Sequence, residues 1–78
     1  MKEVVSLSSL DKGQVCKVLK IETNLHLKRR LLELGFISGT TVKIEDISPL
    51  KNSYLLQIRG YLIALRKNAV SSIIVEKM

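Results

Sequence analysis

The sequence is poor in the residues that build most catalytic and metal sites. Its 78 residues include one cysteine, one histidine and no tryptophan, and aromatic residues make up only 4%. A single cysteine excludes an internal disulfide and a zinc site built from several cysteines, and it suits a reducing compartment. A chain this short forms one domain with little room for a substrate cleft. We therefore treat residues 1–78 as a single domain that acts through its surface.

Long apolar stretches are also missing. The apolar runs fall far short of the roughly 20 residues that a membrane-spanning helix needs. The first residues include Lys2 and Glu3 and are not followed by the long apolar segment of a signal peptide. These two absences predict a cytoplasmic protein that does not insert directly into a membrane.

No group of residues has the spacing of a catalytic or metal site. Cys16 and His26 are the only thiol and imidazole, and nothing in the sequence joins them into a nucleophile–base pair. Glu45 and Asp46 are adjacent on a predicted strand, so their side chains point to opposite faces. The glycines are dispersed, which excludes a glycine-rich phosphate-binding loop. We predict that the chain is not an enzyme and has no catalytic residue, cofactor or metal site.

Aliphatic residues and positive charge are what the sequence has in excess. The hydrophobic fraction is 46%, the charged fraction is 26%, and the formal net charge is +6. Such a charge favours an anionic partner. However, the basic residues are scattered apart from Lys28, Arg29 and Arg30, and few aromatics are available to stack on bases. A basic nucleic-acid-binding barrel stays an alternative, although no nucleic-acid partner is expected.

Turn residues divide most of the chain into short segments with the composition of strands. Aliphatic residues alternate or cluster between glycine, proline, asparagine and serine, which indicates a small all-β barrel. The five predicted strands cover residues 14–21, 40–47, 54–59, 61–66 and 73–75. Residues 67–72 are expected to form one helical turn or a loop.

One helix is predicted between the first two strands, over residues 25–34. Thr23 or Asn24 can cap its start, because both side chains accept hydrogen bonds from free backbone amides. Gly35 supplies the left-handed conformation that ends many helices. The predicted fold is therefore mainly β, a small five-stranded barrel with one helix inserted between strands one and two.

Leucines form two stripes along this helix. The first stripe has the i, i+4, i+7 spacing of a face that packs on the barrel: Leu27, Leu31 and Leu34. The second stripe consists of Leu25 and Leu32, flanked by Lys28 and Arg29. Two interpretations stay open. Either both stripes belong to the core, or the second is an exposed recognition surface, since apolar anchors beside arginine are common in protein interfaces.

A second candidate surface lies in the hairpin loop of residues 48–53. Ile47, Leu50, Leu55 and Leu62 lie in this loop or outside the predicted inward phase, so some of them are expected to form an exposed apolar patch. Ordinary scattered surface leucines are the alternative. The candidate partner-binding residues are Leu25, Lys28, Arg29, Leu32, Pro49 and Leu50.

The order of these segments resembles the ferrous iron transport protein A (FeoA) family. The resemblance covers about residues 7–75 and is carried by five motifs: Leu27-Lys-Arg-Arg-Leu-Leu-Glu-Leu-Gly35, Gly39-Thr-Thr-Val-Lys-Ile44, Ser48-Pro-Leu50, Gly60-Tyr-Leu-Ile-Ala-Leu-Arg66 and Ile73-Ile-Val75. Two loops depart from the family pattern. Ser38 stands where the family often has proline, and residues 51–53 stand where it often has glycine and proline.

The resemblance implies an SH3-like barrel that serves bacterial ferrous iron uptake as an adaptor or regulator. Its expected partner is the cytosolic part of FeoB, a membrane permease with a GTPase domain, and iron chemistry is not expected in this chain. The same barrel is similar to the C-terminal domain of metal-dependent repressors. A regulatory barrel that binds a peptide by strand addition or in a groove is therefore an alternative. A weak homo-oligomer is also left open.

Overall fold

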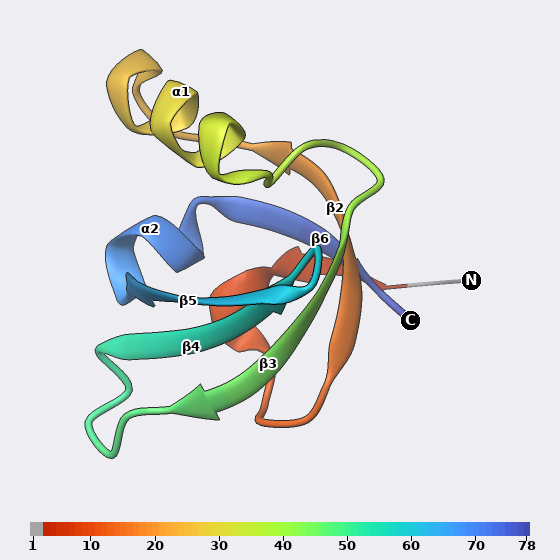
Figure 1. The fold of residues 1–78 in the computed structure, drawn as a ribbon, viewed down its shortest axis with the longest axis vertical. Coiled ribbons are helices and arrows are strands. Elements are labelled where there is room, and N and C mark those ends of the chain that lie inside the picture. The colour runs from red at the N-terminus through yellow and green to blue at the C-terminus, as the bar shows by residue number, and fades with distance from the viewer. Residues whose placement is uncertain (1–2) are drawn as a thin grey trace.

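Six strands form one antiparallel sheet in the computed structural model, which describes residues 3–78 (Figure 1). They are β1 (Val4–Ser6), β2 (Val15–Ile21), β3 (Thr41–Ile47), β4 (Ser53–Ile58), β5 (Tyr61–Arg66) and β6 (Ile73–Lys77). Their order across the sheet is β1-β6-β2-β3-β4-β5. The mainly β fold is confirmed, but the predicted count of five strands was one too low.

The missed strand is β1. It has only three residues, too few to show an alternating pattern, and it exists because Val4, Val5 and Ser6 pair with β6. Tertiary pairing of this kind is not visible in local sequence.

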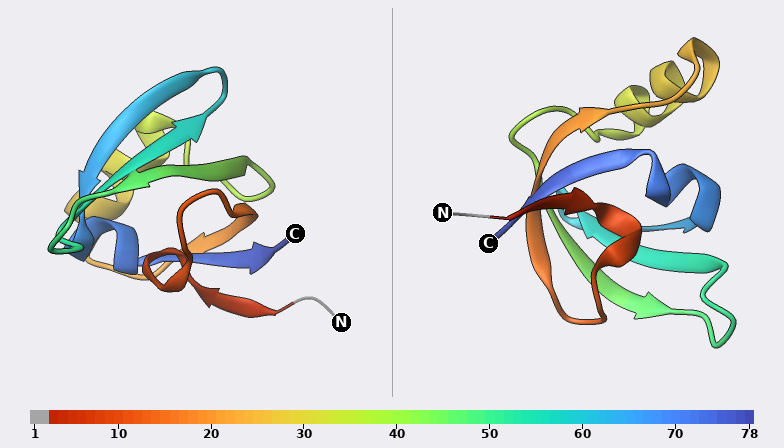
Figure 2. Two further views of the ribbon diagram at one scale, coloured as in Figure 1. Left: turned by 90° about the horizontal axis from the view of Figure 1, so that it is seen from below. Right: turned by 180° about the vertical axis from the view of Figure 1, so that it is seen from behind.

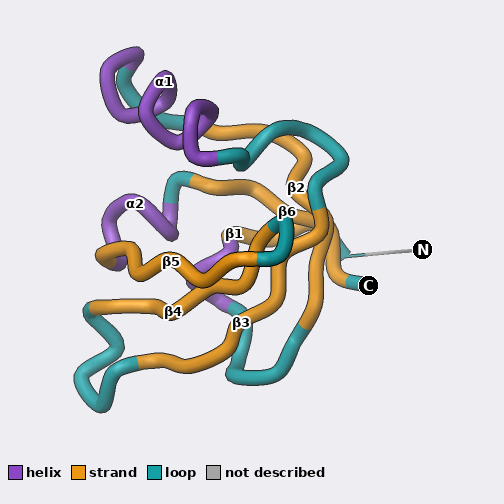
Figure 3. Tube along the Cα trace, in the orientation of Figure 1, coloured by secondary structure: helices purple, strands orange, loops and turns teal. Residues whose placement is uncertain are grey.

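Within residues 3–78, three helical segments accompany the sheet (Figure 3). The inserted helix α1 covers Leu25–Leu34, as predicted, and lies between β2 and β3. The segment predicted as a helical turn or loop is a short helix, α2 (Lys67–Ser71), between β5 and β6. A 3-10 turn, η1 (Leu7–Ser9), follows β1.

Two irregularities in the ladders help the sheet to curl. The register shifts between Val18 and Lys20 where β2 pairs with β6, and between Ile44 and Asp46 where β3 pairs with β4. Bulges of this kind bend a strand and increase its twist. The sheet folds around a core that contains the largest buried side chains: Leu7, Leu10, Val18, Leu31, Phe36, Val42, Ile44, Tyr54, Leu56, Ile58, Val70 and Ile73.

The ends of α1 form as the sequence predicts. Of the two candidate caps, Asn24 is the one used, because its Oδ1 accepts a hydrogen bond from the Leu27 N–H at 2.9 Å. Gly35 ends the helix with a φ of 113°. Phe36 is fully buried directly after this turn and joins α1 to the core. The helix therefore lies over one side of the curled sheet (Figures 1 and 2).

Candidate interaction surface

The outward side of α1 is uncovered. We call Leu25, Lys28, Arg29 and Leu32 the α1 outer face. All four side chains are exposed, and the two leucines expose 68% and 40% of their surface. Exposed leucines with two neighbouring cations are the composition expected of a docking surface.

The opposite side of α1 packs on the barrel. Leu31 is buried, while Leu27 and Leu34 are partly buried against the core. The prediction for the first leucine stripe is confirmed, and the interpretation that placed both stripes in the core was wrong. The reason is that the sheet covers α1 from one side only, whereas residues 3–78 contain no further element on the other side.

The hairpin loop between β3 and β4 holds the other predicted site residues. Pro49 and Leu50 are both exposed, and Leu50 exposes 84% of its surface. The loop is ordered by Ser48, whose Oγ accepts hydrogen bonds at 3.1 Å from the backbone N–H groups of Asn52 and Ser53. A leucine held outward by an ordered loop is a second accessible anchor.

The six predicted site residues do not form one patch. The α1 helix and the loop between β3 and β4 lie at opposite ends of the molecule (Figure 1). Of the other leucines and isoleucines thought to be exposed, Leu62 is exposed at 57%, whereas Ile47 packs against the core and Leu55 is half-buried. One partner would therefore meet the α1 outer face or the loop, but not both through a single flat contact.

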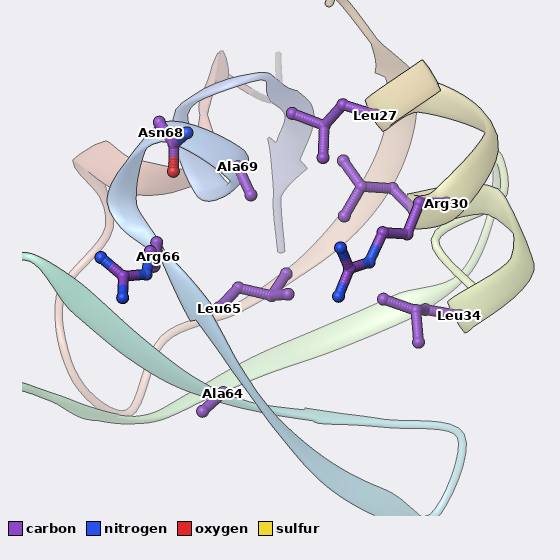
Figure 4. A pocket seen from close by; sticks show the side chains of 9 residues that line it. Leu27, Arg30, Leu34, Ala64, Leu65, Arg66, Asn68 and Ala69 are labelled. Atoms are coloured by element: carbon purple, nitrogen blue, oxygen red, sulfur yellow. The ribbon is translucent and has the colours of Figure 1, made fainter. Parts of the chain in front are cut away.

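A feature that sequence reasoning missed is a groove of about 370 Å³ between α1, β5 and α2 (Figure 4). We call it the α1–β5 groove. Its volume lies within the roughly 300–1,000 Å³ range of ligand sites. Its lining is mostly aliphatic and includes no carboxylate: Leu27, Arg30, Leu31, Leu34, Ala64, Leu65, Arg66, Asn68 and Ala69. Figure 4 shows Arg30 reaching from α1 into the gap toward Leu65.

Strand β5 borders this groove with an open edge. It pairs with β4 on one side and is the last strand in the sheet order (Figure 2). The two-residue turn of Arg59 and Gly60, with φ values of 50° and 86°, has the conformation of a tight hairpin, so Ile58 and Tyr61 form a hydrogen-bonded pair. By the alternation of an antiparallel ladder, Leu62 and Ala64 direct their backbone N–H and C=O groups away from β4.

Positive charge is in excess on α1, on two turns and where β5 meets α2. The helix α1, the turns at residues 48–52 and 59–60, the last residue of β5 and the start of α2 contain a single carboxylate, Glu33. The cations in these segments are Lys28, Arg29, Arg30, Lys51, Arg59, Arg66 and Lys67. Across residues 3–78, none of these cations forms an ion pair with a carboxylate. Two of them, Arg30 and Arg66, line the groove itself, and their charge is not locally neutralised.

Carboxylates elsewhere in the described part of the chain are mostly paired. Four ion pairs join an exposed or half-exposed lysine to a nearby acid: Lys12–Asp46 at 3.7 Å, Lys20–Glu22 at 3.8 Å, Lys43–Glu45 at 3.9 Å and Lys77–Glu3 at 3.1 Å. Glu45 and Asp46 thus each contact a lysine. Such surface pairs contribute little to stability, and neither arginine of the groove lining, Arg30 or Arg66, takes part in one of them.

Cys16 has a structural environment. It is fully buried on β2, and its Sγ donates a hydrogen bond to the Val42 carbonyl at 3.5 Å. Burial raises the pKa of the Cys16 thiol to about 11. His26 is exposed on α1. The thiol therefore stays protonated near neutral pH and is a core side chain rather than an activated nucleophile.

Clusters of metal-ligating side chains and membrane-spanning helices are both absent from residues 3–78. No three side chains of the His, Cys, Asp and Glu types gather there in a way that could hold a metal ion. None of the helices in this part of the chain has the length and apolar character needed to cross a bilayer.

Comparison with known proteins gives a family and a relative. The model of the FeoA domain family matches residues 5–77. A curated relative from Porphyromonas gingivalis, the Fe(2+) transport protein A/Fe(2+) transporter FeoB fusion protein, is 30% identical over 70 residues. The match covers 90% of this chain but only 8% of the fusion protein. The chain thus spans a small part of that relative.

Solved structures share the fold. A FeoA-like protein from Clostridium acetobutylicum has a TM-score of 0.90 at 28% identity and covers 100% of this chain and 91% of its own. The FeoA of Stenotrophomonas maltophilia, solved with zinc and described as a prokaryotic SH3 domain protein, has a TM-score of 0.78 at 28% identity. That match covers 96% of this chain and 88% of the other. The predicted SH3-like fold is confirmed.

The similarity to repressors also holds for the fold. A manganese-dependent transcriptional repressor has a TM-score of 0.89 at 15% identity, with 96% of this chain and 37% of the repressor covered. At that identity the match shows a shared fold only. The family model, in contrast, matches nearly the whole sequence, and the strand order, inserted helix and resembling motifs lie within the matched range. This chain therefore belongs to the FeoA domain family.

Proposed function

We propose that this chain is a cytoplasmic adaptor or regulator of bacterial ferrous iron uptake that docks on the cytosolic part of a FeoB permease. The observation that supports this most strongly is the relative in which a transport protein A and a FeoB transporter share one polypeptide. A fusion holds two domains at high effective concentration, which favours a weak contact between them. The proposal assigns the chain no catalytic step, no cofactor and no resident metal.

The α1 outer face is the surface we propose for docking. Leu25 and Leu32 are exposed side by side with Lys28 and Arg29. Full burial of one leucine stabilises a complex by about 2 kcal/mol, and the two cations would orient a partner with an acidic rim. The partner surface is thus expected to be apolar at its centre and acidic around it.

The test compares charged substitutions at two exposed leucines. Purified wild-type chain, Leu32→Glu and Leu50→Glu are titrated by calorimetry into the cytosolic portion of FeoB from the same organism, with and without guanine nucleotide. Since about 2 kcal/mol corresponds to roughly 30-fold in affinity, Leu32→Glu is expected to weaken binding at least that much. Leu50→Glu is the matched control, because it introduces the same charge at the other end of the molecule.

The possible results distinguish a wrong docking surface from a wrong partner. Loss of binding by Leu50→Glu alone would move the docking site to the loop between β3 and β4. If the wild-type chain fails to bind in either nucleotide state, the FeoB partnership itself is wrong.

A further inference from the structure

The open edge of β5 is the first feature that indicates a second binding site. Leu62 and Ala64 direct one donor and one acceptor each away from β4, and Ala64 lines the α1–β5 groove. An extended peptide can add to such an edge as a further strand, since its backbone supplies the complementary groups. Natural proteins protect exposed edges with charges or cover. Here α1 stands across the groove from the edge instead of covering it (Figure 4).

The second observation is the floor of the groove. Leu27 and Leu34 from α1 lie across the gap from Leu65 of β5, and Leu31 also lines the groove. A strand presents alternate side chains to opposite faces. A peptide lying along β5 would therefore place every second side chain over this aliphatic floor. The groove suits an apolar side chain at that position.

The third observation is the charge around the groove. Arg30 extends into the gap and Arg66 lines the end of the groove beside α2, and neither forms an ion pair with a carboxylate among residues 3–78. Arg59 lies nearby, because its Cδ is within reach of Gly35 at the end of α1. Guanidinium groups bind carboxylates in planar, charge-assisted pairs. Residues that flank the apolar side chain in a bound peptide are therefore expected to be acidic.

From these three observations we propose that the α1–β5 groove binds an extended peptide segment, which adds to β5 and carries an apolar side chain flanked by carboxylates. The site is separate from the α1 outer face, and the proposal holds whether or not FeoB is the docking partner. Peptide is favoured over a lipid surface, because a bilayer offers no backbone groups to Leu62 and Ala64. It is favoured over nucleic acid, because the groove lining contains no aromatic ring for base stacking.

The experiment is an NMR titration of the full chain with designed peptides. The probe is the blocked pentapeptide acetyl-Glu-Val-Leu-Val-Glu-amide, and a second peptide replaces both glutamates with lysine. A third peptide keeps the acidic sequence but carries N-methyl groups on the two valine amides. We expect the first peptide to shift the amide signals of Leu62 and Ala64 and to bind roughly tenfold more tightly than either of the others, from the lost charge pairs or lost strand hydrogen bonds.

Substitutions in the chain test the same charge contact and the same strand hydrogen bonds. Arg30→Gln is expected to weaken the acidic peptide about five- to tenfold and to leave the lysine peptide unchanged. Lys12→Gln is the matched control, because it removes the same charge beside Asp46, away from the groove. Ala64→Pro removes an edge N–H that β4 does not use, a position where an edge strand tolerates proline. If that variant does not fold, the N-methylated peptide supplies the same test.

Several results would overturn the proposal. These are equal binding of the acidic and lysine peptides, signal shifts confined to the α1 outer face, and no binding of the acidic peptide at millimolar concentration. Phosphatidylcholine–phosphatidylglycerol vesicles or single-stranded DNA could also shift the NMR signals of the groove residues. If one of them does so and the peptide does not, the groove arginines serve a different class of partner. Acid-selective binding with shifts at Leu62 and Ala64 supports it.

Discussion

Gly35 links the end of α1 to the barrel, and its replacement by alanine should destabilise the fold through two separable effects. The backbone φ of 113° is unfavourable for any residue with a Cβ. An added Cβ would also lie 3.1 Å from Arg59 Cδ, 3.5 Å from Tyr61 Oη and 3.7 Å from Ile58 Cδ1. The first effect costs about 1–2 kcal/mol, and the tight contact with Arg59 adds up to about 1 kcal/mol of overpacking.

Gly39→Ala separates these effects. Gly39 has a comparable φ of 94°, but a Cβ there would meet no atom within 4 Å. This control therefore carries only the backbone cost. Since 1 kcal/mol shifts the Tm of a domain this size by roughly 4–8 °C, we expect both variants to melt below wild type, and Gly35→Ala to melt lower by several further degrees.

Arg59 allows the contact to be measured by a double-mutant cycle. Arg59→Gly removes the crowding side chain and also relieves the positive φ of 50° at that turn, so the single variant should be neutral or more stable than wild type. Gly35→Ala should then cost no more in the Arg59→Gly background than Gly39→Ala costs in wild type. Urea unfolding of the four variants gives the coupling energy. Equal destabilisation by Gly35→Ala in both backgrounds would show that the Arg59 contact is unimportant and would refute the reasoning.

Two further predictions concern the buried thiol and the excess charge. Because the pKa of Cys16 is raised to about 11, from about 9 for a free thiol, the folded state holds its proton more tightly than the unfolded state. The free energy of unfolding should therefore be unaffected by this group below pH 9 and fall by about 2–3 kcal/mol as the pH rises from 9 to 11. Urea titrations of wild type and Cys16→Ala across this range isolate the effect, since all other groups titrate in both; parallel pH profiles would contradict it. The net charge of +6 should give weak binding to single-stranded DNA that falls steeply with salt, and fluorescence anisotropy between 50 and 200 mM salt checks this. Binding that tolerates the higher salt would show that phosphate contacts do not drive it, and would count against the nucleic-acid alternative.

Local patterns were enough to predict α1 and most of the sheet. Asn24, the first leucine stripe and Gly35 define the helix through contacts within a few residues of one another. Strands β2, β3 and β4 have turn residues on both sides, whereas turn residues precede β5 and β6. By contrast, β1 depends on pairing between residues about 70 positions apart, and its three residues carry no pattern of their own. Exposure of the second leucine stripe was also undecidable, because it depends on which sides of α1 the rest of the chain covers.

The α1–β5 groove could not be predicted, because its walls meet only through the sheet topology. Arg30 lies on α1, which follows β2, whereas Arg66 is the last residue of β5. In the sequence, Arg30 is one of three consecutive cations and looks like part of a solvated helix face. The fold turns it toward Leu65, away from Arg29 on the outer face. The helix α1 thus separates two basic, aliphatic surfaces, and residues that are adjacent in sequence belong to different surfaces. Substitutions at Arg29 and Arg30 are expected to affect different binding events, and a charge run in a sequence of this kind should be tested one residue at a time.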